Sequence, residues 1–336
     1  MTGMEWYLPL IWAALLGTAV ALYVILDGFD LGIGILFPFA KSDAERDQMM
    51  ASVAPFWDGN ETWLVLGGGG LLVAFPAAYA VIMPAFYIPV IVMLLALVMR
   101  GVTFEFRGIA RHKGRWNAIF AAASTLAAFC QGVILGGFVH GVPIANGQFA
   151  GGPLGWATPF AVLCGLGVVA GYALTGATWL SMKTEGALAA HSRAQARMLL
   201  IAVLVFMGIV SLWTPLAVPR IAARWFSWPN ILFLWPVPII TVLVAYAAWK
   251  WLGEGREVRP FFCAIALFLL GYLGLAISTF PYLVPPSLTI WAAAAAPASQ
   301  IFMLIGTLFL LPIILGYTGF IYWLFRGKVR AGESYH

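Results

Sequence analysis

Residues 80–101 read AVIMPAFYIPVIVMLLALVMRG, and Arg100 is the only charged residue in this stretch. About 20 apolar residues in helical form cross the roughly 30 Å of hydrocarbon in a bilayer. The chain contains nine such runs: 8–37, 57–75, 80–101, 116–138, 157–182, 199–218, 229–250, 260–281 and 300–325. They are continuously apolar and longer than barrel strands, which alternate. The sequence therefore predicts an all-α integral membrane protein with about nine transmembrane helices.

The composition excludes a soluble protein. Of 336 residues, 62% are hydrophobic and 9% are charged, whereas soluble proteins carry about 25% charged residues. The net charge of +5 fits basic membrane loops, so no nucleic-acid partner is expected. The N-terminal MTGMEWYLPL lacks a basic region and a small-residue cleavage site. We expect an uncleaved first span and a single polytopic membrane domain over residues 1–336.

The basic residues predict the orientation. With nine spans, 16 of the 18 Lys and Arg residues fall on one face, and only Arg220 and Arg224 fall on the other. The 16 are Lys41, Arg46, Arg100, Arg107, Arg111, Lys113, Arg115, Lys183, Arg193, Arg197, Lys250, Arg256, Arg259, Arg326, Lys328 and Arg330. By the positive-inside rule, the N-terminus is periplasmic and the C-terminus is cytoplasmic.

Charged residues within the spans gather near the cytoplasmic ends of the first three. Asp27 and Asp30 stand at i, i+3 late in the first run, as do Asp58 and Glu61 early in the second, and Arg100 ends the third. A charged side chain inside a bilayer costs about 2.5–3.5 kcal/mol on insertion scales and usually marks an ion or proton path. We expect proton access from the cytoplasm; the alternative for Asp58 and Glu61 is stabilisation of a helix N-terminus.

Two glycine patterns and two tryptophans also have alternative explanations. Gly28 and Gly32 are four apart, which favours close helix packing. The glycines at 67–70 indicate either close packing or a broken helix that lines a transport site. Trp57 and Trp63 are typical of interfacial anchors, and contact with a partner or a quinone is the alternative.

No metal site is expected. Cys130, Cys164 and Cys263 are isolated, and the four histidines, His112, His140, His191 and His336, lie in expected loops, at a helix end or at the C-terminus. A haem needs an axial ligand, and Met93, Met99 and Cys130, the other candidates, are more often packing residues. The chain is therefore expected to ligate no haem.

The motifs DGFDLGIG at 27–34 and PFWDGNETWLV at 55–65 resemble subunit II of the cytochrome bd-type terminal oxidases. Arg100 and the segment FEFR at 104–107 extend the resemblance, which beyond residue 116 rests mainly on hydropathy. It implies a subunit without haem in a bacterial inner-membrane heterodimer. The partner, subunit I, would hold two haems b and one haem d, oxidise quinol near the outer face, and reduce dioxygen to water.

The resemblance also implies roles for individual residues. Asp58 with Trp57 would begin a cytoplasmic proton route, and Asp27, Asp30 and Arg100 would surround it. The string at 61–63, Glu-Thr-Trp, differs from the Gln-Val-Trp of one well-known branch and is closer to the cyanide-insensitive branch. Because Gln does not titrate, any proton-carrying role of Glu61 would be specific to that branch. Some members bind a quinone in subunit II as a structural lipid, and the resemblance leaves open a small accessory subunit.

Two other functions remain possible from the residues. A proton-coupled secondary transporter would use the carboxylates for coupling, but such proteins place their site near the membrane midplane between internal repeats. A structural scaffold would have no proton chemistry. A haem-containing protein that co-purifies with the chain would favour the oxidase, whereas a colourless homo-oligomer would favour the transporter.

Overall fold

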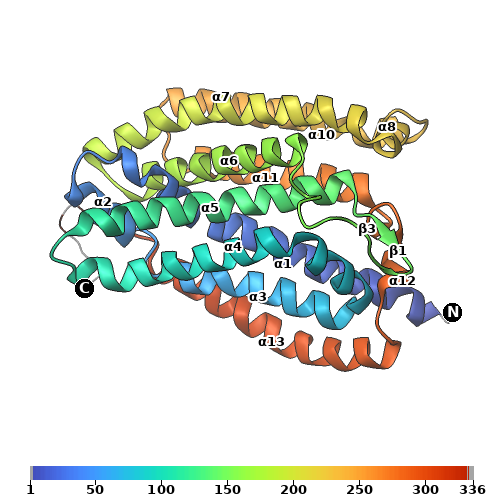
Figure 1. The fold of residues 1–336 in the computed structure, drawn as a ribbon. Coiled ribbons are helices and arrows are strands. Elements are labelled where there is room, and N and C mark those ends of the chain that lie inside the picture. The colour runs from blue at the N-terminus through green and yellow to red at the C-terminus, as the bar shows by residue number, and fades with distance from the viewer. Residues whose placement is uncertain (1–2, 331, 333–336) are drawn as a thin grey trace.

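The structure is a computed structural model that describes residues 3–330 and 332. Nine long helices in the described chain lie side by side along one common direction (Figure 1). These are α1 (Gly3–Leu36), α3 (Trp57–Ala74), α4 (Pro76–Ile109), α5 (Lys113–His140), α6 (Pro159–Lys183), α7 (Gly186–Ala217), α10 (Pro236–Gly253), α11 (Arg259–Thr279) and α13 (Pro297–Leu324). Each corresponds to one of the nine expected runs. The all-α fold is confirmed.

Short elements close the two ends of the bundle. The short helices are η1 (Phe37–Phe39), α2 (Asp43–Ala51), α8 (Pro219–Trp225), α9 (Asn230–Leu234) and α12 (Ile290–Ala293). Two antiparallel hairpins pair β1 (Ile144–Ala145) with β2 (Gln148–Phe149) and β3 (Tyr282–Val284) with β4 (Leu288–Thr289). The α2 helix lies at one end of the bundle, and the hairpins lie at the other (Figure 1).

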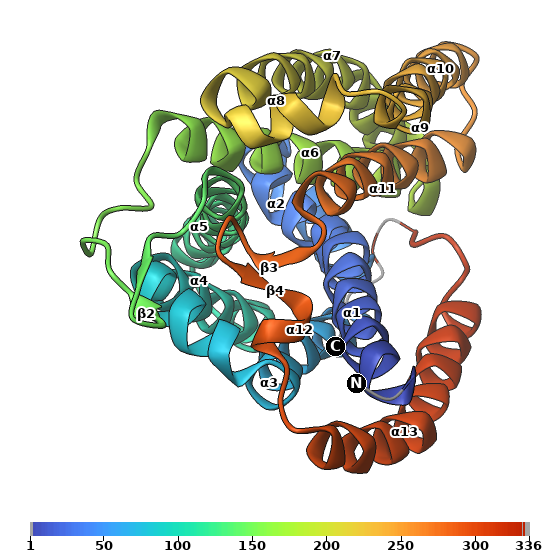
Figure 2. The ribbon, with the colours of Figure 1, turned by 90° about the vertical axis from the view of Figure 1, so that its right-hand side faces the viewer.

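Eight of the nine long helices are apolar enough to cross a membrane within the part of the chain that the structure describes. The exception is α3, which covers the expected run 57–75. It has 18 residues, and its first turns contain Asp58, Asn60 and Glu61, which lower its hydropathy. In the bundle, α3 nevertheless runs beside α1 (Figures 1 and 2). Its polar residues therefore enter the helix bundle together with its apolar ones.

The bundle has a basic end. The first turn of α1 and the last turn of α13 lie at opposite ends (Figure 1), as an odd number of passes requires. The connections α1–α2, α4–α5, α6–α7 and α10–α11 and the segment after α13 share the end at which α2 lies, and the 16 basic residues lie in these segments or in the parts of the helices next to them. At the other end, Arg220 and Arg224 donate to the carbonyl oxygens of Val139 and Phe280. The side of the membrane on which each end lies stays a prediction.

Glycines let α1 and α6 pack backbone against backbone. A Cβ atom on Gly32 would lie 1.8 Å from the carbonyl oxygen of Tyr172, and one on Gly176 would lie 2.5 Å from the carbonyl carbon of Gly32. The expectation of close packing at Gly32 is confirmed. Within residues 67–70, helix α3 is continuous, and Gly70 packs on Leu16. This stretch is therefore not the broken helix that a transport site would use.

Helix α13 stands at the periphery, beside α1 and α3 (Figure 2). None of its most apolar stretch is buried within the described chain, and Gln300 is its one fully buried residue. Large apolar side chains such as Phe302, Leu308 and Phe309 are exposed on it. The outward faces of this helix are therefore available to lipid or to another protein chain.

Candidate functional site

Two aspartates of α1 form the centre of the candidate site. Asp27 and Asp30 are one helical turn apart, and neither is exposed at all. Asp27 lies nine residues before the end of α1, about 14 Å at 1.5 Å per residue. Full burial of two carboxylates is costly unless each is paired or hydrogen-bonded. The neighbouring helices supply a partner for each.

Arg100 of α4 pairs with Asp27. Its Nη1 atom lies 2.7 Å from Asp27 Oδ1 and 3.7 Å from Glu61 Oε1, and its side chain is completely buried. The guanidinium carbon is 6.0 Å from the centroid of the Phe104 ring. Glu61 is 24% exposed, so it lies between the buried pair and the surface of the chain. One arginine therefore links carboxylates from α1 and α3.

Asn60 and Tyr322 hold Asp30. The Nδ2 atom of Asn60 donates to Asp30 Oδ2 at 2.7 Å and to the carbonyl oxygen of Leu26 at 3.2 Å. The Tyr322 hydroxyl donates to Asn60 Oδ1 at 3.0 Å. Asn60 is 1% exposed. Helices α1, α3 and α13 therefore meet at a single amide.

Each buried aspartate has one oxygen that accepts a hydrogen bond and one that does not. Asp27 Oδ2 and Asp30 Oδ1 are buried without a hydrogen-bond partner in the described chain, as are Glu61 Oε1 and the Nε and Nη2 atoms of Arg100. Leaving one such buried group unsatisfied costs about 1–3 kcal/mol, and more when it is charged. Several unsatisfied atoms at one place indicate a functional site better than a structural one.

The other expected site residues lie around this centre. Asp58 is exposed, one turn before Glu61 on α3, and it does not join the buried cluster. Trp57 is partly buried and stacks on Phe104, with ring centroids 4.9 Å apart. Trp63 is 2% exposed and packs in this chain with Ala19 and Tyr23. Burial leaves Trp63 little surface for a partner or quinone; contact through Trp57 stays a prediction.

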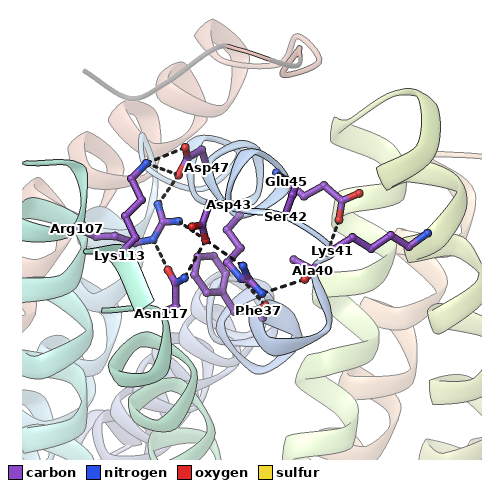
Figure 3. Close-up of polar contacts among 11 residues, drawn as sticks. Phe37, Ala40, Lys41, Ser42, Asp43, Glu45, Asp47, Arg107, Lys113 and Asn117 are labelled. Carbon is purple, nitrogen blue, oxygen red and sulfur yellow. Dashed lines mark hydrogen bonds and ion pairs between the residues drawn. The ribbon is translucent and has the colours of Figure 1, made fainter. Parts of the chain in front are cut away.

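A second polar cluster anchors α2 at the same end (Figure 3). Arg107 Nη1 lies 2.5 Å from Asp47 Oδ1, and Lys113 Nζ lies 2.9 Å from Asp47 Oδ2. Burial acts to raise the pKa of Asp47, but the hydrogen bonds from Lys113 and Arg107 and their charges outweigh it and hold that pKa below its ordinary value. Hydrogen bonds from Arg46 and Asn117 lower the pKa of Asp43. Both oxygens of Asp47 accept hydrogen bonds, as expected of a structural group, although Arg107 Nη2 is buried without a hydrogen-bond partner in the described chain.

The histidines and cysteines are dispersed. His112 and His140 are exposed at the two ends of α5, and His191 lies in α7; His336 lies outside the described residues. The three cysteines are buried and free. Residues 3–330 and 332 contain no group of three His, Cys, Asp or Glu that could hold a metal ion. That this chain ligates no haem stays a prediction, and no step of chemistry is assigned to a haem in it.

Two residues of the site, Asn60 and Tyr322, were not among those predicted from the sequence. Asn60 lies inside the motif PFWDGNETWLV, between the two acids, and a polar residue in an apolar helix was a usable signal. Tyr322 gave no signal, because tyrosine near a helix end is ordinary at a membrane interface. The structure brings it to α3 from 262 positions away in the chain.

Comparisons with known proteins identify the family of this chain. Residues 8–325 match the family described as cytochrome bd terminal oxidase subunit II. The chain is 30% identical to cytochrome bd-I ubiquinol oxidase subunit 2 of Escherichia coli strain K12, over 96% of this chain and 95% of that protein. It is 28% identical to cytochrome bd ubiquinol oxidase subunit 2 of Bacillus subtilis strain 168, over 96% and 97%. A chain in the structure of bd oxidase from Geobacillus thermodenitrificans superimposes with a TM-score of 0.77 at 12% identity, covering 97% of this chain and 99% of that one.

Proposed function

Since the chain belongs to the cytochrome bd terminal oxidase subunit II family, we propose that its buried carboxylates carry protons from the cytoplasm toward the oxygen-reducing centre of the complex. Membership makes the chain a multi-pass protein of the bacterial cytoplasmic membrane and a subunit of a quinol oxidase complex. Beyond what membership gives, the buried ionisable residues of the chain are assigned to proton transfer.

The observation that supports the proposal is the full burial of Asp27, Asp30 and Arg100 with unpartnered atoms on each. Two carboxylates that served only to join helices would be expected to accept hydrogen bonds through both oxygens, as Asp47 does from Arg107 and Lys113. An unpartnered carboxylate oxygen is a position at which a proton or a water molecule can bind. The site therefore combines buried charge with free proton acceptors.

Exposure decreases along the proposed route. Asp58 is exposed, Glu61 is 24% exposed, and Asp27 and Asp30 are not exposed. A proton taken up at Asp58 would pass one helical turn along α3 to Glu61. It would then reach the free oxygens of the α1 pair, with Arg100 balancing the negative charge. Because this end of the bundle carries the basic segments, we assign it to the cytoplasm.

The cofactors belong to the partner in this proposal. Two haems b and one haem d would be held by subunit I, which would oxidise quinol and reduce dioxygen to water. The chain described here would supply protons and support that subunit. The partly buried Trp57, next to Asp58, is the residue that we expect to contact the partner or a bound quinone. Lipid and a small accessory subunit would cover other apolar faces.

The test is the replacement Asp30→Asn in the purified complex. This change keeps the size of the side chain and an oxygen that accepts from Asn60, but it removes the titratable group. We expect quinol-driven oxygen consumption per haem to fall by about tenfold or more, since a positioned proton-transfer group contributes about 10²–10⁴-fold. Haem content should stay near that of the parent. The control is Glu105→Gln, which neutralises an exposed carboxylate of α4 near the same end. Equal turnover in Asp30→Asn and the parent would remove Asp30 from the route.

A further inference from the structure

The end of helix α13 is fixed to the basic end of the bundle by Lys183. This side chain, 5% exposed, donates from Nζ to the carbonyl oxygens of Phe325 and Gly327 at 2.5 and 2.6 Å. The backbone N–H of Val329 donates in return to the carbonyl oxygen of Lys183 at 2.7 Å. The last turn of an otherwise exposed helix is therefore held at one definite position.

This position brings Tyr322 to the carboxylate site. Its ring stacks on Phe56, with centroids 4.5 Å apart and planes inclined by 22°. Its hydroxyl then reaches Asn60 Oδ1 at 3.0 Å. The stacking fixes the ring independently of the hydroxyl, so the hydroxyl has one specific task, the hydrogen bond to Asn60.

The hydrogen bonds determine which way the Asn60 amide faces. The carbonyl oxygen of Leu26 can only accept, so the amino group of Asn60 must face it. The same amino group donates to Asp30 Oδ2, and the amide oxygen is left to accept from Tyr322. Asp30 Oδ2 therefore faces a donor. A proton on Asp30 is favoured on Oδ1, the buried oxygen without a partner, because Oδ2 then keeps its full capacity to accept from Asn60.

We infer that Tyr322 is a positioning residue for Asp30, acting through Asn60, so that the last helix completes the proton-carrying site. The inference rests on the proposed function, since it assigns Asp30 a proton to carry. Tyr322 holds the amide that occupies Oδ2 and leaves Oδ1 open. Without the hydroxyl, Asn60 Oδ1 loses its donor, and the amide is held less firmly against Asp30, by the bonds of its amino group alone.

Several charged or titratable groups face Asp30 from the surrounding helices, and all of them remain in place when the Tyr322 hydroxyl is removed. They are Asp27 of α1, Glu61 of α3 and Arg100 of α4. Tyr322 of α13 also faces Asp30, and its hydroxyl is the group that the variant removes. A changed pH dependence in a Tyr322 variant therefore reports on the hydrogen bond and not on the loss of a charge.

The experiment compares Tyr322→Phe with Tyr317→Phe in the purified complex. Tyr317 lies on the same helix and is 64% exposed, so its variant controls for the loss of a hydroxyl from α13. In Tyr322→Phe the remaining phenyl ring can still stack on Phe56, which should preserve assembly. We expect Tyr322→Phe to lower oxygen consumption per haem by about three- to tenfold, the effect of one hydrogen bond. It should also displace the pH profile of turnover, with normal haem content. Tyr317→Phe should change neither.

A purely structural role predicts a different result, in which Tyr322→Phe lowers turnover by the same factor at every pH, together with haem content. That result, or a rate and profile equal to the parent, would overturn the inference. The Asp30→Asn variant distinguishes a failure of the proposed proton route from a failure of the positioning role of Tyr322. If Asp30→Asn slows turnover but Tyr322→Phe has no effect, only the role of Tyr322 fails. If Asp30→Asn turns over like the parent, both fail. If both proposals hold, adding Tyr322→Phe to Asp30→Asn has no further effect on the pH profile.

Discussion

Arg100 Nη1 lies 2.7 Å from Asp27 Oδ1, and neither side chain is exposed. The pair joins α1 to α4 at a depth where an unpaired charge is costly. Removal of one member of a buried ion pair is strongly destabilising, whereas replacement of both by apolar residues is often tolerated. This asymmetry separates the pair's contribution to assembly from any contribution to proton transfer.

The first prediction concerns assembly. Arg100→Leu leaves Asp27 buried without a counter-charge, and we expect a loss of about 3–5 kcal/mol of stability. The yield of haem-containing complex and its thermal unfolding measure this loss. The double variant Asp27→Leu with Arg100→Leu should recover much of the yield but not the turnover. If Arg100→Leu were as stable as the parent, the ion pair between Asp27 and Arg100 would not contribute to the stability of the complex.

The second prediction concerns pH and the anchor of α2. The pKa of Asp47 is lowered in the folded chain, so its ion pairs contribute stability above the unfolded value of about 3.9. This contribution is lost as the pH falls through the lower, folded value. Thermal unfolding of the parent and Asp47→Asn should therefore differ at neutral pH and converge below about pH 4. A difference that stays constant as the pH falls would show that Asp47 does not act through its charge.

The third prediction tests the contact of α1 with α6. Gly32→Val should abolish assembly, because even a Cβ atom there would overlap the carbonyl oxygen of Tyr172. Gly208→Ala is the matched control, since a Cβ atom at this helical glycine of α7 has nothing within 4 Å. It should be neutral or stabilising by up to about 1 kcal/mol. Membrane-inserted, haem-containing complex is the quantity to compare. Normal assembly of Gly32→Val would contradict the backbone contact.

The fourth prediction concerns orientation. His112→Cys should be protected from a membrane-impermeant thiol reagent in intact cells, and Gln148→Cys should react. Both positions are exposed, at the basic end and in the β1–β2 hairpin respectively. The native cysteines are buried, so background labelling should be low. The opposite labelling pattern would show that the N-terminus is cytoplasmic and the C-terminus periplasmic.

The helical fold could be predicted from the sequence because each span must satisfy its own backbone hydrogen bonds in lipid. Continuous apolar runs therefore correspond to helices almost one to one. Their ends were less predictable: α7 begins at Gly186, well before the expected run at 199. Residues 186–198 carry Arg193 and Arg197, which hydropathy alone places outside a helix, whereas a helix can extend beyond the bilayer.

The candidate site could be predicted only in part. Asp27, Asp30, Glu61 and Arg100 could be found because charge inside a span is rare. The pairing of these residues could not be predicted, because sequence spacing within one helix does not indicate which side chain of another helix lies opposite. Tyr322 shows this limit most clearly: its role depends on where Lys183 and Phe56 hold the end of α13.

Proton entry at Asp58 is tested by quinol-driven oxygen consumption per haem in Asp58→Asn. Asparagine would also suit the start of a helix, so assembly and haem content should stay near the parent's. We expect turnover to fall by about tenfold or more, and Asp58→Glu to retain much of it because a carboxylate remains. Turnover of Asp58→Asn equal to that of the parent, at equal haem content, would show that protons do not enter through Asp58.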